Sequence, residues 1–294
     1  MLRRGEVVAF PTETVYGLGA DAQNEAAVRR VFDIKGRPLG HPVIVHLASA
    51  EELGDWARRI SPEAQLLAET FWPGPLTLVL PRTARASDLV TGGQDSVAVR
   101  VPANPVAHAL LERAGIGVVA PSANRFGRVS ATRAEHVAAD LGDAVDLIVD
   151  GGPAAIGIES TIVSFIGKRP AILRPGGLTR ERIEAVLGMP LEMAGADAVR
   201  VPGSLPSHYA PRARIELFEE APAARRRAAE LEGSGARAVL LDLADDVQSS
   251  ARDLYDLLRR ADAAGAAAIV VVLPPEGGLG SALRDRLQRA AAKP

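Results

Sequence analysis

The sequence predicts an α/β protein in two parts: a larger part with a twisted mixed sheet and flanking helices, then a small unit with a parallel, Rossmann-like sheet. Three observations support this prediction. The 294 residues suggest two domains at roughly 150 residues each. Residues 1 to about 190 alternate short β-branched runs with helical patterns, which is typical of α/β or α+β proteins. A stretch punctuated by proline then leads into three further strand–helix pairs, and their alternation favours a parallel sheet.

The elements of the first part follow from hydrophobic patterns of strand or helix period. Strands are expected at 6–10, 43–47, 76–80, 96–101, 117–119, 146–149, 161–165 and 171–173. Helices are expected at 24–34, 50–58, 62–70, 104–114, 132–140 and 179–187. Asn24, Ser61 and Thr179 stand at helix starts, where a side-chain oxygen can cap the free N–H groups.

The second part repeats this pattern on a smaller scale. Strands are expected at 215–218, 238–243 and 268–273, and helices at 222–232, 249–264 and 279–291. Residues 191–212 carry Pro202, Pro206 and Pro211 and show no sustained period, so composition alone indicates a passive tether. We therefore expect domains at 1–190 and 213–294, joined by this linker.

Composition excludes several classes of protein. The chain is 47% hydrophobic and 24% charged, as in ordinary soluble globular proteins, and no stretch reaches the ~18 consecutive apolar residues of a membrane span. Cysteine is absent, which excludes disulfides and thiolate metal sites, and we expect no secretory signal. The net charge of −2 lacks the basic excess of proteins that grip long nucleic acids. We therefore expect little direct nucleic-acid binding, no membrane contact and a cytoplasmic location.

The stretch FPTETVYGLG, residues 10–19, raises two alternatives. The spacing Gly17-x-Gly19-x-x-Ala22 suggests a dinucleotide-binding turn, but the first glycine lies well beyond the strand, and the acidic residue that would hold a ribose is missing. We favour glycines that let the backbone turn tightly and come close to another group. The Thr12-Glu13-Thr14 triplet offers two hydroxyls and a carboxylate, which suit a small ligand with an amine and a hydroxyl.

The next polar segment is KGRPLGHPVIVHL, residues 35–47. Lys35 and Arg37 flank a glycine, and cations at this separation suit phosphate oxygens. The P-loop pattern G-x-x-x-x-G-K-[ST] does not occur in the sequence. His41 and His46 lack the spacing of a zinc motif, and His46 taken alone is typical of a core or rim histidine.

Polar side chains also mark the ends of further strands. In QDSVAVRVP, residues 94–102, Ser96, Ala98 and Arg100 share one strand face, which fits a cleft wall or an exposed strand. Three more segments place hydroxyl, amide or cationic groups beside Gly or Pro: VVAPSANRFGRVS (118–130), GIESTIV (157–163) and AILRPGG (171–177). A plain turn explains any one of them, but together they indicate the sheet edge where ligands bind. Without a nucleophile triad or a carboxylate pair, such cations and hydroxyls favour adenylyl or phosphoryl transfer.

Seven motifs match one known family. In chain order they are PTETVYGLG (11–19), KGRP (35–38), HPVIVH (41–46), WPGPLTL (72–78), VAVRVP (97–102), APSAN (120–124) and LRPG (173–176). This set resembles the YrdC-like threonylcarbamoyl-AMP synthases, over nearly the whole chain. PGSLPSHYAP (202–211) and the C-terminal unit resemble the two-domain form of the family. The resemblance implies a YrdC-like fold for residues 1–190 and a linker that contacts the active site, in place of a passive tether.

The resemblance also implies a reaction. L-threonine, bicarbonate and ATP would give threonylcarbamoyl-AMP and pyrophosphate, with Mg²⁺ held mainly by the ATP phosphates and no organic cofactor. The product would pass to a partner transferase that makes threonylcarbamoyladenosine on tRNA.

Individual residues receive roles only where the motifs match. The threonine site would contain Thr14, His46, Arg100, Ala120 and Ser160, with Arg100 pairing the carboxylate. The ATP site would contain Arg37, His41, Ser96, Ser122, Asn124, Ser130, Arg174 and Tyr209. Lys35, Arg37 and Arg174 would act in catalysis by offsetting negative charge.

Two other functions stay open as alternatives. A large carbamoyltransferase that shares this module would need further domains, for which 294 residues leave no room. A non-enzymatic RNA-binding or translation factor on the same fold would need a basic surface, and the near-neutral charge argues against one. The helix that usually precedes the first strand of this family is expected to be short here.

Overall fold

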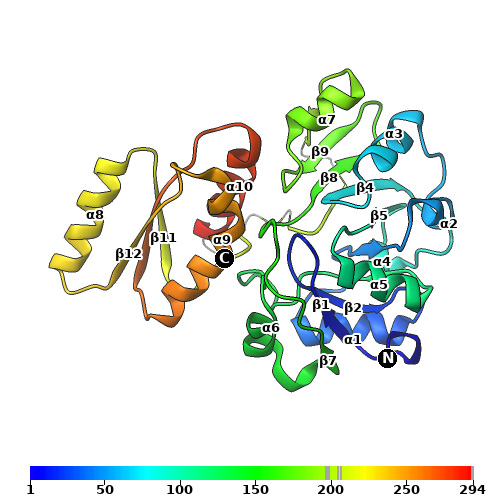
Figure 1. Cartoon of the computed structure of the whole chain (residues 1–294), viewed down its shortest axis with the longest axis horizontal. Coiled ribbons are helices and arrows are strands. Elements are labelled where there is room, and N and C mark those ends of the chain that lie inside the picture. Colours follow the sequence, from blue (N-terminus) through cyan, green and yellow to red (C-terminus); the bar gives the residue numbers. More distant parts are fainter. Residues whose placement is uncertain (196–198, 204, 206, 293–294) are drawn as a thin grey trace.

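The computed structural model describes residues 1–195, 199–203, 205 and 207–292, so the expected linker proline at position 206 lies outside the described residues. The C-terminal unit lies against one flank of the larger N-terminal part (Figure 1).

Among the described residues, the N-terminal part is built on a mixed sheet of ten strands in the order β10-β9-β8-β4-β5-β3-β6-β2-β1-β7. The strands are β1 (Val8–Phe10), β2 (Gly17–Asp21), β3 (Ile44–His46), β4 (Leu76–Pro81), β5 (Ser96–Arg100), β6 (Val118–Val119), β7 (Leu147–Ile148), β8 (Thr161–Ser164), β9 (Ala171–Arg174) and β10 (Glu192–Met193). β3 pairs parallel with β5, whereas β4 pairs antiparallel with β5, which confirms the expected mixed sheet. In β5, Val97 and Val99 join the main core while Ala98 packs in a separate cluster, as the predicted alternation requires.

Helices cover the sheet and hold its strand ends in place. They are α1 (Glu25–Lys35), α2 (Leu53–Trp56), α3 (Pro62–Phe71), α4 (Asp88–Thr91), α5 (Pro105–Ala114), α6 (Ala134–Leu141) and α7 (Arg180–Leu187), with 3₁₀ turns at Leu2–Arg4, Ala50–Glu52 and Gly142–Ala144. Asn24 and Ser61 cap α1 and α3 by accepting backbone N–H groups, as predicted. Thr179 stands at the start of α7, but within the described part of the chain its side chain makes no capping bond, so that expectation is wrong. The helix expected at 50–58 is a 3₁₀ turn followed by the short α2.

The two glycines of the FPTETVYGLG stretch lie in a strand. Gly17 and Gly19 belong to β2, which pairs antiparallel with β1, so the expected tight turn at these glycines is wrong. The expected close approach of the backbone is confirmed, and the groups approached are side chains of the protein itself. A Cβ on Gly19 would lie 2.7 Å from the Phe10 ring, and one on Gly17 would lie 3.0 Å from the Cβ of Ala120. The glycines therefore let β2 pack tightly against its neighbours.

The C-terminal unit is a parallel α/β layer. Its elements are β11 (Arg214–Phe218), α8 (Ala221–Gly233), β12 (Ala238–Asp242), α9 (Val247–Ala263), β13 (Ala268–Val272) and α10 (Gly278–Ala291). Among the described residues its three strands lie in the order β11-β13-β12, and both neighbouring pairs are parallel, as predicted. α8 lies on the side away from the N-terminal part, and α9 and α10 face it (Figure 1).

The two parts share one apolar cluster. Val15, Val129 and Ile158 of the N-terminal part pack with residues of α9 that include Tyr255 and Leu258. At the edge of this contact, Arg259 of α9 forms an ion pair of 2.6 Å with Asp140 of α6. The C-terminal unit therefore docks directly beside the strand ends that carry the sequence motifs. Among the described helices, none combines the length and the apolar character needed to cross a membrane.

Candidate active site

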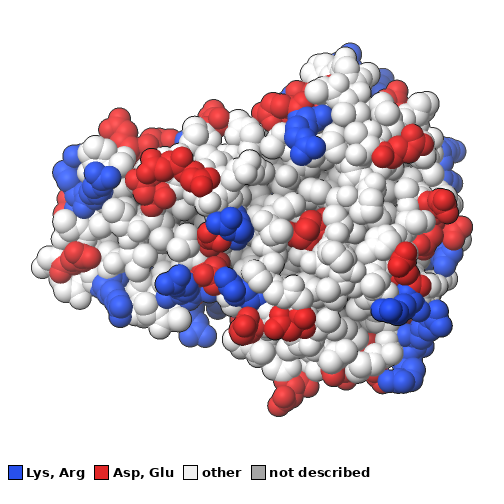
Figure 2. Space-filling view, viewed as in Figure 1, with Lys and Arg blue, Asp and Glu red and all other residues white. Residues whose placement is uncertain are grey.

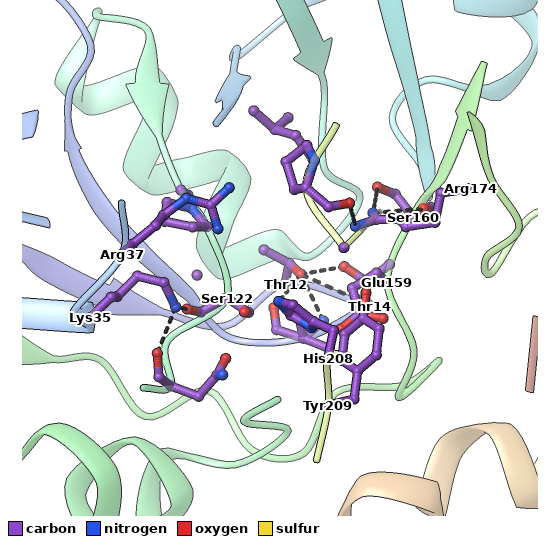
Figure 3. Close-up of a pocket in the computed structure, with 18 of the residues that line it drawn as sticks. Thr12, Thr14, Lys35, Arg37, Ser122, Glu159, Ser160, Arg174, His208 and Tyr209 are labelled. Atoms are coloured by element: carbon purple, nitrogen blue, oxygen red, sulfur yellow. Dashed lines mark hydrogen bonds between the residues drawn. The ribbon is translucent and has the colours of Figure 1, made fainter. Parts of the chain in front are cut away.

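A cavity of about 630 Å³, including its open mouth, lies where the polar strand ends of the N-terminal part meet the linker. It is lined by Thr12, Thr14, Val15, Gly17, Lys35, Arg37, Ile44, His46, Arg100, Ala120, Pro121, Ser122, Asn124, Phe126, Gly127, Glu159, Ser160, Arg174, Pro202, Gly203, His208 and Tyr209. In Figure 3, Lys35 and Arg37 stand on one side of the cavity, and Arg174 with Ser160 stands on the other.

Lys35 and Arg37 leave α1 at its C-terminal end and are both buried. The Lys35 ammonium donates to the backbone carbonyls of Ser122 and Asn124 at 2.5 and 2.6 Å, which ties it to the loop after β6. Arg37 donates to the carbonyl of Pro42 at 2.7 Å. Burial, helped by the charge of Arg37, lowers the pKa of Lys35 well below its usual range, and burial lowers the pKa of Arg37 to about 10. An anionic ligand beside them would raise both pKa values again.

Arg174 ends β9 and reaches back to the segment before β8. Its guanidinium donates to the carbonyl of Ser160 at 2.8 Å and to the Ser160 hydroxyl at 3.1 Å. It also donates to the carbonyl of Pro202 in the linker at 2.9 Å. Burial lowers its pKa, which again favours an anion as its ligand.

Arg100 lies at the end of β5, fixed before any ligand binds. It donates to the Glu13 carboxylate at 2.6 Å and to the Thr14 hydroxyl at 2.8 Å. The other oxygen of Glu13 accepts the backbone N–H of Ala103 at 3.1 Å. Both oxygens of the Glu13 carboxylate are thus hydrogen-bonded within the protein, and Glu13 is not among the residues that line the cavity. The prediction that this carboxylate contacts a ligand is therefore wrong. Thr14 Oγ1 does face the cavity, beside Thr12 Oγ1 at 2.9 Å.

His46 closes the floor of the cavity at the end of β3. Burial, with the nearby charge of Arg100, lowers its pKa to about 3, so the imidazole is neutral at physiological pH. Its Nδ1 has no hydrogen-bond partner among the described residues. Ser160, beside Arg174, shares a hydrogen bond of 2.8 Å with Thr77.

The linker folds over the cavity. Tyr209 adopts a left-handed backbone with φ 62° and is 1% exposed. Its ring lies against His208, with centroids 4.2 Å apart, and stacks on Tyr255 of α9 at 5.7 Å. Gly203, at φ +79°, passes so close that a Cβ would lie 2.2 Å from the Tyr209 hydroxyl. The linker is therefore part of the cavity wall.

The structure brings most of the predicted site residues to this one cavity. Those that line it are Thr14, Lys35, Arg37, His46, Arg100, Ala120, Ser122, Asn124, Ser160, Arg174 and Tyr209. His41, Ser96 and Ser130 lie outside its lining. The Ser130 hydroxyl donates to Glu159 at 2.6 Å, and the His41 ring packs on Phe126 at 5.5 Å, so both stand one layer behind the wall.

Sequence reasoning missed several lining residues. They include Phe126, Glu159, Pro202, Gly203 and His208. Glu159 and His208 lie within motifs that the sequence displays, GIEST and HYAP, so the motifs pointed to the right segments. Which side chain of a motif turns inward depends on local backbone geometry that spacing does not reveal.

Unpartnered buried atoms gather at the cavity. Among the described residues, atoms without a hydrogen-bond partner include Arg37 Nε, His46 Nδ1, Asn124 Oδ1, His208 Nδ1 and the Tyr209 hydroxyl. Each such group costs about 1–3 kcal/mol if it stays unpaired, so a polar ligand that satisfies them is strongly favoured. Cations on opposite walls, with hydroxyls between them, define an α/β protein whose cavity suits a polyanion beside a small polar molecule.

Comparison with known proteins identifies the family. Residues 1–176 match the Sua5/YciO/YrdC family model, described as Telomere recombination, and residues 178–292 match the model described as Threonylcarbamoyl-AMP synthase, C-terminal domain. The chain therefore belongs to the threonylcarbamoyl-AMP synthase family, in its two-domain form, as the motifs indicated.

Relatives match over almost the full length. The chain is 42% identical to a threonylcarbamoyl-AMP synthase of Pyrococcus abyssi, covering 99% of this chain and 92% of the relative. It is also 42% identical to the enzyme of that name from Bacillus subtilis, covering 99% of this chain and 91% of the relative. A crystal structure of P. abyssi Sua5 complexed with L-threonine superimposes with a TM-score of 0.94 at 41% identity, covering 99% of this chain and 92% of that one. The expected two-part α/β fold is thereby confirmed.

Proposed function

We propose that this protein is an L-threonylcarbamoyladenylate synthase, which converts L-threonine, bicarbonate and ATP into threonylcarbamoyl-AMP and pyrophosphate. The observation that carries the proposal is the convergence of Lys35, Arg37 and Arg174 on one cavity that also holds Arg100 and Thr14. Family membership supports the same reaction.

The threonine end of the cavity is the side of Arg100 and Thr14. Each terminal nitrogen of the Arg100 guanidinium carries two N–H groups. One nitrogen donates to Thr14 and the other to Glu13, so one N–H on each remains for a substrate carboxylate. The neutral His46 imidazole can accept or donate a hydrogen bond to threonine without adding charge. Threonine would thus be held by its carboxylate, which leaves its amine free to react.

Chemistry proceeds in two steps that need positioning and charge compensation. The neutral threonine amine attacks the carbon of bicarbonate and forms a C–N bond. A C–O bond of bicarbonate breaks, the amine gives up a proton to the departing hydroxide, and water leaves to give the carbamate. A carbamate oxygen then attacks the α-phosphorus of ATP, the bond to the β-phosphate oxygen breaks, and pyrophosphate leaves. Lys35, Arg37 and Arg174 surround the space for these phosphates and would stabilise the charge that develops there.

Mg²⁺ enters this proposal as part of the nucleotide substrate. Among the described residues that line the cavity, Glu159 alone has a carboxylate, which accepts hydrogen bonds from Arg286, Tyr255 and Ser130. The remaining donors are hydroxyls, amides and cations, which suit phosphate oxygens better than a dedicated metal cage. The phosphates of ATP would therefore carry the ion.

The product would be handed to a transferase that modifies tRNA, and we expect the enzyme to act in the cytoplasm with its substrates. We expect the enzyme itself to bind little RNA directly. On the face seen in Figure 2, basic and acidic side chains are interspersed over both parts and form no continuous basic stripe. The alternative of an RNA-binding factor thus gains no support from this surface.

The test measures pyrophosphate release from Mg–ATP with threonine and bicarbonate, each omitted in turn. We expect release to require all three. Serine in place of threonine tests whether the cavity reads the methyl group, a contact worth about 1–3 kcal/mol. Release that does not depend on threonine would refute the proposal.

A further inference from the structure

Glu159 is the point where the C-terminal unit reaches the cavity. Glu159 lines the cavity and is 6% exposed. One carboxylate oxygen accepts from Arg286 Nε of α10 at 2.7 Å and from the Tyr255 hydroxyl of α9 at 2.8 Å. The other oxygen accepts from the Ser130 hydroxyl at 2.6 Å. Two of its three partners therefore come from the C-terminal unit.

Arg286 contacts three parts of the site with one side chain. It is 1% exposed and pairs with Glu159 and with its neighbour Asp285. It also donates to the carbonyl of Pro175 at 2.8 Å, the residue that follows Arg174. Its guanidinium lies 5.1 Å from the ring centroid of Tyr209, within the range of a cation–π contact. A single arginine from the last helix thus links the cavity wall, the end of β9 and the linker.

The negative charge of Glu159 makes its ion pair with Arg286 important for nucleotide binding. A carboxylate in the wall opposes the entry of phosphates unless a cation cancels it. Removing one partner of a buried ion pair leaves an uncompensated charge and is strongly unfavourable. Arg174 is a second cation that acts on Glu159, and drawing it toward the carboxylate would remove it from Ser160 and from the phosphates.

We propose that Arg286 is a positioning residue for ATP binding: it cancels the charge of Glu159 and supports Tyr209, so that the C-terminal unit completes the catalytic cavity. This inference rests on the proposed function, because ATP is the ligand it concerns. It gives the C-terminal unit a definite role in the site.

The test measures equilibrium binding of Mg–ATP by calorimetry in the full chain. Arg286→Met removes the charge, Arg286→Lys keeps it, and Glu159→Gln/Arg286→Met removes both charges of the pair. We expect Arg286→Met to weaken ATP binding at least tenfold at pH 8, the lysine variant to lose less, and the double variant to recover most of the loss. Arg284→Met is the matched control, since it lies in the same helix but pairs with the exposed Glu219, and it should bind as the wild type does.

The pH dependence separates this role from a merely structural one. In the wild type, burial acts to raise the pKa of Glu159, but Arg286 and Arg174 hold it at about 2. In Arg286→Met, the groups that still face the carboxyl are Arg174, the buried phenols of Tyr255 and Tyr209, and His208, which burial keeps neutral. The pKa of Glu159 should then rise, so that protonation relieves the defect. ATP binding by this variant, relative to wild type, should improve from pH 8 to pH 6, and the double variant should show no such change.

Two results would overturn the inference: ATP binding in Arg286→Met within twofold of the wild type, or a double variant as weak as Arg286→Met at both pH values. If Arg286→Met does not fold by circular dichroism, the double variant decides, because its ATP affinity must approach the wild-type value. A wild-type protein that binds Mg–ATP but releases no pyrophosphate would refute the proposed function and leave this inference intact.

Discussion

Arg174 is held from two sides before a ligand arrives, by Ser160 in the wall and by Pro202 in the linker. Lys35 is held in the same way by two backbone carbonyls. Because these acceptors are neutral, the contacts fix the position of each side chain without placing a counter-ion against it. Preorganised cations of this kind stabilise developing charge without reorganisation during the reaction.

Replacing either cation by alanine should therefore slow the reaction without unfolding the protein. Removal of one well-placed donor costs on the order of 3 kcal/mol, or about 100-fold in rate. We expect Arg174→Ala and Lys35→Ala each to lose at least this factor in threonine-dependent pyrophosphate release, with near-native circular dichroism. Lys168→Ala, on the exposed turn between β8 and β9, is the matched control. Near-wild-type turnover in Arg174→Ala would remove that residue from the site.

Glu13 gives a second prediction at the residue scale. It orients Arg100 and has no place in the cavity lining, so its replacement should act through threonine binding. Glu13→Gln keeps the shape but weakens a charge-assisted bond worth about 1.5–3 kcal/mol. We expect threonine affinity, measured by calorimetry, to fall by tenfold or more, while ATP affinity changes less than threefold. Equal losses for both ligands would contradict this role.

At the scale of elements, long periodic segments could be predicted and short ones could not. The helices α1, α3 and α5 and the parallel C-terminal sheet follow from periodicity and capping. α4 and β10 span four and two residues, too few for a pattern to emerge. β2 could not be predicted because its glycines are typical of a turn, whereas here they allow close packing on Phe10.

Most of the site could be located from strand ends, but Glu159 and His208 could not, because tertiary contacts decide which way they face.

The linker is the element whose role is easiest to test. Replacing residues 202–211 by ten Gly/Ser residues keeps the reach of the tether but removes His208 and Tyr209 from the cavity wall. We expect both parts to stay folded and the catalytic efficiency for ATP to fall at least tenfold, because the wall over the nucleotide is lost. Kinetics equal to those of the wild type would restore the passive tether.

At the scale of the whole molecule, buried histidines make stability depend on pH. Burial lowers the pKa of His46 and of His208 to about 3, compared with an ordinary value of 6.5. In the unfolded chain both histidines take up a proton below about pH 6.5. Because the folded state binds fewer protons, stability is highest above pH 6.5 and falls as the pH drops toward 3. Glu159, with a pKa of about 2, adds a further loss below its ordinary value of 4.5.

The free energy of unfolding should consequently drop between pH 7 and pH 5, by about 2 kcal/mol for each fully buried histidine. Urea titrations at the two pH values measure this difference. His208→Asn removes one of the two histidines with the largest shifts, so the drop should shrink by about 2 kcal/mol in this variant. A drop of the same size in His208→Asn as in the wild type would mean that the histidine of the linker is hydrated in solution, and the linker would then not be closed over the cavity in the free protein.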